Sequence, residues 1–596
     1  MKIRFWMALG LAWAVPDGAF AQADFEAFAE GVAARWLRAD PESATATQYF
    51  TGAEQDALDR QLVATGPSGH ALDPVRRAAD LAQLRREREQ LQQFDRRQLM
   101  PGQRLVADSI LESIDSSLAG VEFEDHAFSF NQMGGLHVSL VNFLSQTHPI
   151  RNPRDVENYL ARLAQVAGVM DRSIDWTRAQ DARGLRLPHF ILTAVLEQVD
   201  EFLTPPAAES VLVTSLAERA ARVQALTEAE RARAVAAATK IVDEAILPAY
   251  RRLRVLIAEQ IPGATDDAGL WRLPRGTAAY ASALRRNTGT ELSPGEIHSL
   301  GLREVARIEA EMDQILRELG YRDGTVTARY AALNEKVMPP SEPDPRPGLV
   351  EEYARVVREA ERRSAELFDL RPKARIEVRR EPSLTESTMA AHYSSPAPDG
   401  SQPGIFWAPL PDNWRSLIWV GAGLRSVTYH EAVPGHHFQI ALRQELPDVP
   451  RYVRLNVFGS STAYSEGWAL YAEKLVAEAG WYEGDQPGRL GQLNFELFRA
   501  RRLVVDSGLH ARLWTRQQAI DYGIQPSEVD RYVVWPGQAC SYKIGELEIL
   551  RLRAKAQQAL GARFSLKKFH NVVLGSGNVS LRTLDRLVDE YIAAAR

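Results

Sequence analysis

The stretch His430-Glu431-Ala432-Val433-Pro434-Gly435-His436-His437 contains three of the chain's 12 histidines, and a glutamate follows the first of them. Neutral imidazole is a good zinc ligand, and a hydrolytic zinc site keeps one position open for water. A carboxylate near the metal takes the proton from that water. In the familiar helical form, H-E-x-x-H, two histidines at i and i+4 share one face of a helix. The stretch therefore predicts a zinc-binding helix, with His430 as a ligand and Glu431 as the general base.

The second histidine of this stretch lies at i+6 or i+7 instead of i+4. Over six residues a straight helix rises about 9 Å and turns about 120° out of phase, so it cannot offer both rings to one metal ion. Pro434 breaks the helical hydrogen bonding, and Gly435 tolerates irregular dihedral angles. We expect them to form a bulge of two extra residues in a helix that runs to about Leu446, which returns His436 to the i+4 place. His437 would take that place only if three residues were extruded. The plainer alternative is a helix that ends at Pro-Gly.

A site with two histidines needs a third protein ligand, and a glutamate from a following helix is a known solution. Glu466 lies 30 residues after His436, among small and aromatic residues where an unpaired carboxylate would be costly to bury. Glu473 is the competitor, seven residues further along the same helix face, and we expect it in a supporting or surface role. The sequence thus predicts one Zn²⁺ per chain in a gluzincin-like site formed by His430, His436 and Glu466.

Two later stretches contain candidate catalytic side chains. A helix expected over residues 498–513 places Arg502, Asp506 and His510 at i, i+4 and i+8, a stripe that can orient zinc-bound histidines or contact a substrate carboxylate. A plain Arg–Asp pair within the helix is the alternative. Tyr542 lies at the start of the next expected helix and could donate a hydrogen bond to the oxyanion of a tetrahedral intermediate. We predict this role for Tyr542, together with His510.

The composition describes an ordinary soluble globular protein of 596 residues, with 45% hydrophobic and 25% charged residues. This length exceeds the size of a single hydrophobic core, so at least two regions are expected. The net charge of −6 and the acidic residues interleaved with the arginines argue against nucleic acid as a partner.

The N-terminus has the pattern of a secretory signal peptide over residues 1–21. A basic start is followed by a short apolar run, and Ala19-Phe20-Ala21 fits a small-x-small cleavage site. The apolar run is about half the length that a transmembrane helix needs. No cysteine stands at the cleavage site, and Cys540 is the chain's single cysteine. We therefore expect a periplasmic or secreted protein without internal disulfides and without a stable membrane anchor.

The mature chain is predicted to be mostly α, with an N-terminal helical region (22–290) and a catalytic region (291–596). Capping boxes at Thr227 and Ser293 each predict the start of a helix, Pro248 should bend the first of these, and residues 262–292 form an irregular boundary. Strand-like patterns at 375–379 and 404–410 predict a small β element before the zinc-binding helix. Pro409 marks the second as an edge strand or a strand end. An edge strand there would suit a substrate peptide that adds itself to the sheet, and a purely structural hairpin is the alternative.

Three motifs resemble those of the bacterial family known as DUF885. They are His430-Glu431-x-x-Pro434-Gly435-His436-His437-x-Gln439, Ser465-Glu466-Gly467-Trp468-Ala469 and Pro536-Gly537-Gln538-Ala539-x-Ser541-Tyr542-Lys543-x-Gly545. The resemblance extends over nearly all of the mature chain. The family pattern H-E-x-x-P-G-H favours His436 over His437. It implies a zincin-like, multi-helix metallopeptidase architecture with a cleft, and it implies no particular substrate.

We therefore expect an exported zinc metallopeptidase that hydrolyses short peptides. Zinc would activate a water, and Glu431 would take its proton and deliver it to the leaving amine. Two alternatives remain open: a zinc hydrolase that cuts a non-peptide amide or ester, and a non-catalytic, metal-containing binding protein of the cell envelope. Glu431 argues against the second alternative, because a site that only holds a metal needs no carboxylate beside its first ligand.

Overall fold

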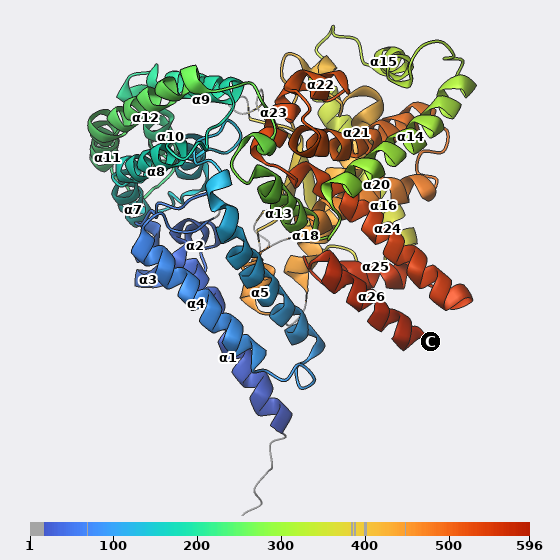
Figure 1. Cartoon of the computed structure of the whole chain (residues 1–596), viewed down its shortest axis with the longest axis horizontal. Helices are drawn as coiled ribbons and strands as arrows, with labels where there is room; N and C mark the ends of the chain where they lie inside the picture. The colour runs from blue at the N-terminus through green and yellow to red at the C-terminus, as the bar shows by residue number, and fades with distance from the viewer. Residues whose placement is uncertain are drawn as a thin grey trace, which may run out of the picture.

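The chain is mostly helical, as the sequence predicts, with 70% helix and 3% strand (Figure 1). This computed structural model describes residues 17–67, 69–382, 386, 389–397, 402–446, 449–459 and 461–596, with side chains from residue 24 onward. Most of the predicted signal peptide therefore lies outside the described residues. None of the described helices is both long enough and apolar enough to span a membrane.

The chain up to residue 260 forms helices, as expected. They are α1 (Asp17–Ala39), α2 (Pro41–Thr47), α3 (Gly52–Asp59), α4 (Pro74–Gln92), α5 (Pro101–Gly120), α6 (Leu136–Asn142), α7 (Pro153–Leu163), α8 (Val166–Asp181), α9 (His189–Leu203), α10 (Val211–Ala220), α11 (Glu228–Ile241) and α12 (Leu247–Gln260). The predicted capping box opens α11, where the Glu230 N–H donates to the Thr227 hydroxyl at 3.3 Å. A π-helical turn over Val242–Ile246 interrupts the helix just before Pro248, where the bend is predicted.

Residues 262–292, predicted as an irregular boundary, contain a helix, α13 (Gly276–Thr288). Its flanking residues Arg275 and Gly289 both adopt left-handed backbone conformations, so the helix is bounded closely on both sides. The sequence did not predict this helix, because the glycines and prolines near its ends are also typical of loops. The predicted capping box at Ser293 then opens α14 (Pro294–Glu318), and α15 (Val326–Val337) and α16 (Arg346–Leu367) follow.

A three-stranded sheet follows α16, in the order β1-β3-β2. β1 (Ile376–Arg380) pairs in parallel with β3 (Gly404–Ala408), and β2 (His392–Ser394) pairs antiparallel with the other side of β3. Both predicted strands are therefore present, but β3 is central, so its prediction as an edge strand is wrong. It ends directly before Pro409, as the strand-end alternative predicts, because a central strand needs backbone donors on both sides. β2 is an edge strand that no sequence pattern revealed.

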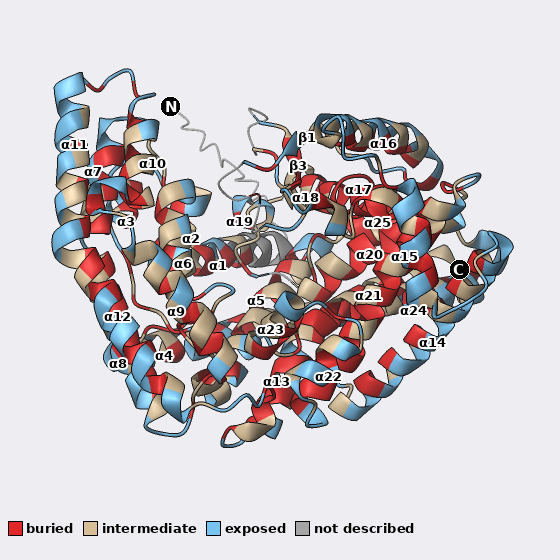
Figure 2. Cartoon of the chain, turned by 90° about the horizontal axis from the view of Figure 1, so that it is seen from above, coloured by how far each residue is buried: buried red, intermediate tan, exposed pale blue. Residues whose placement is uncertain are grey.

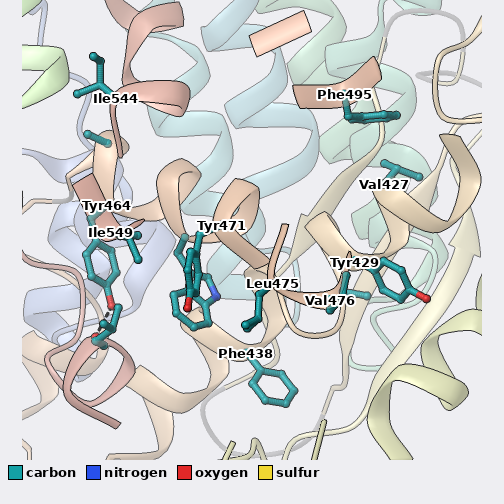
Figure 3. Close-up of a cluster of buried hydrophobic side chains, with 14 of the residues drawn as sticks. Val427, Tyr429, Phe438, Tyr464, Tyr471, Leu475, Val476, Phe495, Ile544 and Ile549 are labelled. Atoms are coloured by element: carbon teal, nitrogen blue, oxygen red, sulfur yellow. Dashed lines mark hydrogen bonds between the residues drawn. The ribbon is translucent and has the colours of Figure 1, made fainter. Parts of the chain in front are cut away.

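The remaining chain is helical and forms the most deeply buried part of the molecule (Figure 2). Its helices are α17 (Leu424–Glu431), α18 (His436–Glu445), α19 (Arg451–Arg454), α20 (Thr462–Glu478), α21 (Gln486–Ala511), α22 (Arg516–Asp521), α23 (Pro526–Val534), α24 (Ser541–Leu560), α25 (Leu566–Gly575) and α26 (Leu581–Ala595). Buried side chains of α17, α18, α20, α21 and α24 form one apolar core (Figure 3). α21 begins earlier than the helix predicted from residue 498, and most of its residues are buried.

The hydrophobic cores cross the predicted division at residue 290. One core joins the helices α7–α12 to side chains of α21 and α23, including Val505, Leu509 and Tyr532. Another joins α1 and α5 to Tyr452 and Phe458, which lie before α20. The two predicted regions therefore complete each other's cores.

Candidate metal centre

The stretch predicted to bind zinc forms two helices instead of one helix with a bulge. α17 ends at Glu431, α18 begins at His436, and residues 432–435 between them are not helical. The His437 N–H donates to the Ala432 carbonyl at 3.2 Å, and the Trp468 indole N–H donates to the Pro434 carbonyl at 3.0 Å. A side chain at Gly435 would overlap the carbonyl oxygen of His430, so this position requires glycine. The helix break takes the place of the predicted bulge and brings His436 back to His430.

His430, His436 and Glu466 lie together, with their candidate ligand atoms within 4.8 Å of one another. One carboxylate oxygen of Glu466 lies 3.5 Å from Nε2 of His430 and 3.4 Å from Nε2 of His436. The two imidazole rings stand nearly perpendicular, with their centroids 4.9 Å apart. These three side chains are the ones that the sequence predicts as zinc ligands.

Glu473 orients the first histidine from the side away from this cluster. Its carboxylate accepts a hydrogen bond from His430 Nδ1 at 2.8 Å and another from the Ser426 hydroxyl, and it is completely buried. With Nδ1 donating, Nε2 of His430 is the nitrogen that faces Glu466. A carboxylate behind a histidine ligand is a common way to fix the ring and its tautomer in metal sites. Glu473 is thus a supporting residue, and it is not at the surface.

The charges around His430 favour a cation at this place. Burial alone would lower the pKa of the His430 imidazole, but its hydrogen bonds with Glu466 and Glu473 raise it to about 9. Burial would likewise raise the pKa of Glu466, but hydrogen bonds with His430 and His436 hold it well below its ordinary value. Buried carboxylates need a compensating positive charge, which either a proton or a metal ion can supply.

His437 lies apart from the cluster. Its Nδ1 forms a hydrogen bond of 2.8 Å with the Tyr393 hydroxyl, and its side chain is 2% exposed. Burial lowers the pKa of its imidazole to about 4, which keeps the ring neutral. Of the two histidines that the sequence left in competition, His436 is therefore the one placed beside His430.

Glu431 and Tyr542 line the same cavity, of about 1170 Å³, as the three candidate ligands. Burial raises the pKa of the Glu431 carboxyl, and the neighbouring His430 and His436 lower it. The Tyr542 hydroxyl lies 3.4 Å from the guanidinium of Arg531, which can donate to it. The structure thus brings both predicted catalytic residues to the cavity.

His510 does not reach this cavity, which corrects its predicted role at the oxyanion. Its Nδ1 accepts a hydrogen bond from the Leu270 N–H at 3.0 Å, its Nε2 lies 3.0 Å from the Tyr532 carbonyl, and its side chain is fully buried. Asp506 is also occupied elsewhere, because it accepts hydrogen bonds from Tyr280 and from the backbone of Gly537. Asp506 and His510 of the predicted stripe therefore connect α21 to neighbouring segments of the chain. Asp506 does not form the ion pair with Arg502 that was the alternative.

The second and third motifs meet where α20 crosses α24. A Cβ at Gly467 would lie 2.5 Å from the Cα of Gly545, so both positions need glycine for the backbones to approach this closely. Lys543 lies beside the crossing in a buried ion cluster. Its ammonium nitrogen is 2.8 Å from a carboxylate oxygen of Glu496 and 2.6 Å from one of Glu546. The crossing fixes α20, and with it Glu466, against the helix that begins at Tyr542.

Several cavity residues were missed by sequence reasoning. Arg499 and Arg531 line the cavity beside Arg502, and His392 and Tyr393 line it from the edge strand β2. A single arginine in an Arg-rich helical sequence has no spacing that distinguishes it. The position of Arg499 three residues before Arg502, on the same helix face, is the one signal that could have indicated it.

The fold and the site define a mostly helical protein with a candidate metal centre of two histidines and one glutamate. The chain belongs to DUF885, a family described as bacterial protein of unknown function, whose model matches residues 48–588. It is similar to the crystal structure of a predicted lipoprotein from Colwellia psychrerythraea, with 30% identity, a TM-score of 0.84, and 95% of this chain and 99% of the other covered. A predicted lipoprotein of unknown function from Shewanella oneidensis shares the fold, with 18% identity, a TM-score of 0.71 and coverages of 94% and 99%. Comparison with curated proteins gives no match.

Proposed function

We propose that this protein is an exported, zinc-dependent metallopeptidase that hydrolyses short peptides. The observation that carries the proposal is the convergence of His430, His436 and Glu466 on one point of a cavity that Glu431 also lines. A proton acceptor beside a three-ligand site is the arrangement of a hydrolytic metal centre.

The distances from Glu466 to the two histidines fit zinc. Ligand atoms at about 2.0–2.1 Å from one tetrahedral ion lie about 3.3 Å from each other. The Glu466 oxygen lies 3.4 and 3.5 Å from the two histidine nitrogens. Nitrogen and oxygen donors of this kind suit zinc, and three protein ligands leave one position open for water.

The chain's own residues can carry out the proton transfers of amide hydrolysis. Zinc, when bound, supplies a Lewis acid that polarises the carbonyl and acidifies the attacking water. Glu431 accepts the proton of that water and passes it to the departing amine, while the water oxygen bonds to the carbonyl carbon and the C–N bond breaks. The raised pKa of Glu431 suits a group that must first take up and then release a proton. Tyr542, whose hydroxyl can accept a hydrogen bond from Arg531, can donate a hydrogen bond to the carbonyl oxygen as negative charge develops there.

The cavity favours an extended peptide as the substrate. Its volume of about 1170 Å³ exceeds the common range for small-molecule sites, about 300–1,000 Å³. The edge strand β2 contributes His392 and Tyr393 to the lining and pairs with β3 on one side. A peptide could therefore add to its other side as a further strand, next to the candidate ligands.

An exported location rests on the predicted signal peptide and on the relatives. The similar proteins of known structure are described as predicted lipoproteins, which belong to the cell envelope. We place this chain in the periplasm or outside the cell.

Metal analysis of the purified mature protein tests the site itself. We expect close to one zinc per chain and its loss in His436→Ala and Glu466→Ala. His437→Ala is the matched control, because it removes the neighbouring ring that bonds to Tyr393, and it should keep most of the zinc. A wild-type protein without any transition metal, or zinc that follows His437 instead of His436, would refute this ligand set.

A peptide-library digest read by mass spectrometry tests the activity. Glu431→Gln keeps the size of the side chain but accepts no proton, so it should retain zinc and lose about 10²–10⁴-fold in kcat/KM. A Glu431→Gln variant with full turnover would exclude Glu431 as the base. If the zinc-loaded wild-type protein cuts no peptide and instead hydrolyses non-peptide amides or esters, the peptidase assignment is wrong and the hydrolytic site stands.

A further inference from the structure

Arg499 is a buried guanidinium that lines the cavity without a carboxylate partner among the described residues. It is 7% exposed, its Nε has no hydrogen-bond partner among the described residues, and one of its terminal nitrogens donates to the Phe495 carbonyl at 3.4 Å. The rings of Phe495 and Phe498 lie 4.7 and 5.4 Å from the guanidinium carbon. Aromatic faces support an arginine and shield it from water, but they leave its hydrogen-bond donors unused.

Arg499 lies close to the candidate metal centre. Burial lowers the pKa of its guanidinium, and the carboxylates of Glu473 and Glu466 are near enough to raise it. Those two carboxylates are already engaged with His430 and His436, so they do not give Arg499 the direct ion pair that a buried charge needs.

Two more arginines face the cavity next to Arg499, and they share a single carboxylate. Glu528 lies 2.8 Å from Arg502 and 3.2 Å from Arg531. One terminal nitrogen of Arg502 and the Nε of Arg531 are buried without a partner. Arg499, Arg502 and Arg531 therefore line one part of the cavity together, with one carboxylate, Glu528, paired to two of them and with a buried donor on each of the three left unpaired among the described residues.

We propose that Arg499, supported by Arg502 and Arg531, binds a carboxylate of the substrate. This inference rests on the proposed function, since it names the substrate class of the same cavity. A guanidinium presents parallel N–H donors that match both oxygens of a carboxylate, and a desolvated pair of this kind is strong. The carboxylate is either the C-terminal group of a peptide or the side chain of an acidic residue. Because the arginines stand near the candidate zinc ligands, a peptide held by its C-terminus would be cut close to that end.

Peptide binding to the zinc-loaded Glu431→Gln protein tests this without requiring turnover. Three probes share one length: Ala-Ala-Phe as the free acid, Ala-Ala-Phe as the C-terminal amide, and Ala-Ala-Glu as the C-terminal amide. Calorimetry should give a Kd at least about 10-fold lower for one or both of the probes that carry a carboxylate than for Ala-Ala-Phe amide. A preference confined to the free acid identifies the C-terminal group, and a preference confined to the glutamate probe identifies an acidic side chain.

Arg499→Met in the same background should abolish this preference. The Kd of the probes that carry a carboxylate should rise by about 10–100-fold, because a hydrogen bond to a charged group is lost. Arg516→Met is the matched control: Arg516 pairs with Asp530 at 2.6 Å and does not line the cavity, so its loss should leave the preference intact. Equal binding of all three probes, no binding of any, or a preference that survives Arg499→Met would overturn the proposal. The zinc content and the library digest report on the proposed function separately, so a failure of one is distinguishable from a failure of the other.

Discussion

Buried charge is the property that most distinguishes single residues in this protein. Glu473, Asp506 and Lys543 are each completely buried, although burial of an ionisable group is costly unless the group is paired and hydrogen-bonded or held in its neutral form. Each of the three has partners at hydrogen-bond distance: His430 for Glu473, Tyr280 for Asp506, and Glu496 for Lys543. Arg499 is the exception, because it has no carboxylate partner among the residues that the structure describes, and it lines the cavity.

Asp506 gives a prediction for the dependence of stability on pH. Burial raises the pKa of its carboxyl from the ordinary 3.8 to about 7. Between about pH 4 and pH 7 the unfolded chain loses this proton while the folded chain keeps it, so the contribution of Asp506 to stability falls as pH rises. Asp506→Asn cannot titrate, and the Tm of the wild type should therefore decline relative to that of the variant over this range. Thermal unfolding at several pH values between 4 and 7.5 measures the difference.

The control for this prediction is Asp175→Asn, which changes a carboxylate that is 78% exposed on α8. Its Tm curve should run parallel to that of the wild type. Parallel curves for Asp506→Asn as well would show that Asp506 does not keep its proton in the folded protein.

The residues of the candidate site differ in how far their role can be predicted from their neighbours in the sequence. His430 and Glu431 could be predicted because histidine and glutamate at short spacings on helices are characteristic of zinc sites, and Glu466 could be predicted because such a site needs a third ligand from a following helix. His510 could not be excluded from the sequence, because its burial between Leu270 and Tyr532 depends on segments far away in the chain. Arg499 could not be found for the same reason, since only the fold shows that no carboxylate of the described residues pairs with it.

The elements of the site are positioned by close backbone packing. The helix break at Pro434-Gly435 brings two histidines together, and the glycine crossing of α20 and α24 brings Glu466 against them. In both places a glycine lets one backbone approach another where a Cβ would overlap. All three sequence motifs thus describe packing as much as chemistry, since Gly435, Gly467 and Gly545 belong to one motif each.

Gly467→Ala tests the helix crossing. The added Cβ would lie 2.5 Å from the Cα of Gly545, so the two helices must move apart. We expect a loss of about 1–3 kcal/mol in the free energy of unfolding, together with weaker zinc binding because Glu466 is the preceding residue. Denaturant unfolding and a zinc titration measure the two effects.

Gly348→Ala on α16 is the control for the crossing, because a Cβ there meets no atom within 4 Å. It should be neutral or stabilise slightly, since alanine is the better helix former. A Gly467→Ala protein with the stability and zinc affinity of the wild type would mean that the two helices can separate without consequence.

Elements with local start signals could be predicted well, and those defined by distant partners could not. The capping boxes at Thr227 and Ser293 both open helices, because a cap is a contact within four residues. The position of β3 between β1 and β2 depends on pairing across the sheet, which an isolated strand pattern does not contain. α13 was missed because its bounding glycines are the same residues that mark a loop.

At the scale of the whole molecule, α21 connects three of the hydrophobic cores. Its side chains contribute Phe495 to the core around the candidate site, Leu509 to the core of the N-terminal helices, and Leu497 to the core shared with α14 and α15. Arg499 and Arg502 project from the same helix into the cavity. A helix held on several sides can keep charged side chains in place at a site, because its position is fixed by all of these contacts at once.

These shared cores predict that residues 22–290 do not fold independently. The cluster around α7–α12 is completed by Val505, Leu509 and Tyr532, each fully buried, and the Leu270 N–H donates to His510 across the boundary. Each fully buried apolar side chain contributes about 1.5–3 kcal/mol, so losing several of them removes a large part of the stability of a typical domain, about 5–15 kcal/mol. Expressed alone, the fragment should show helical far-ultraviolet circular dichroism but no cooperative thermal transition, and co-expression with residues 291–596 should restore one. A fragment that unfolds as cooperatively as the full chain would show instead that the N-terminal helices form a domain of their own, and that α21 only covers a core that is already complete.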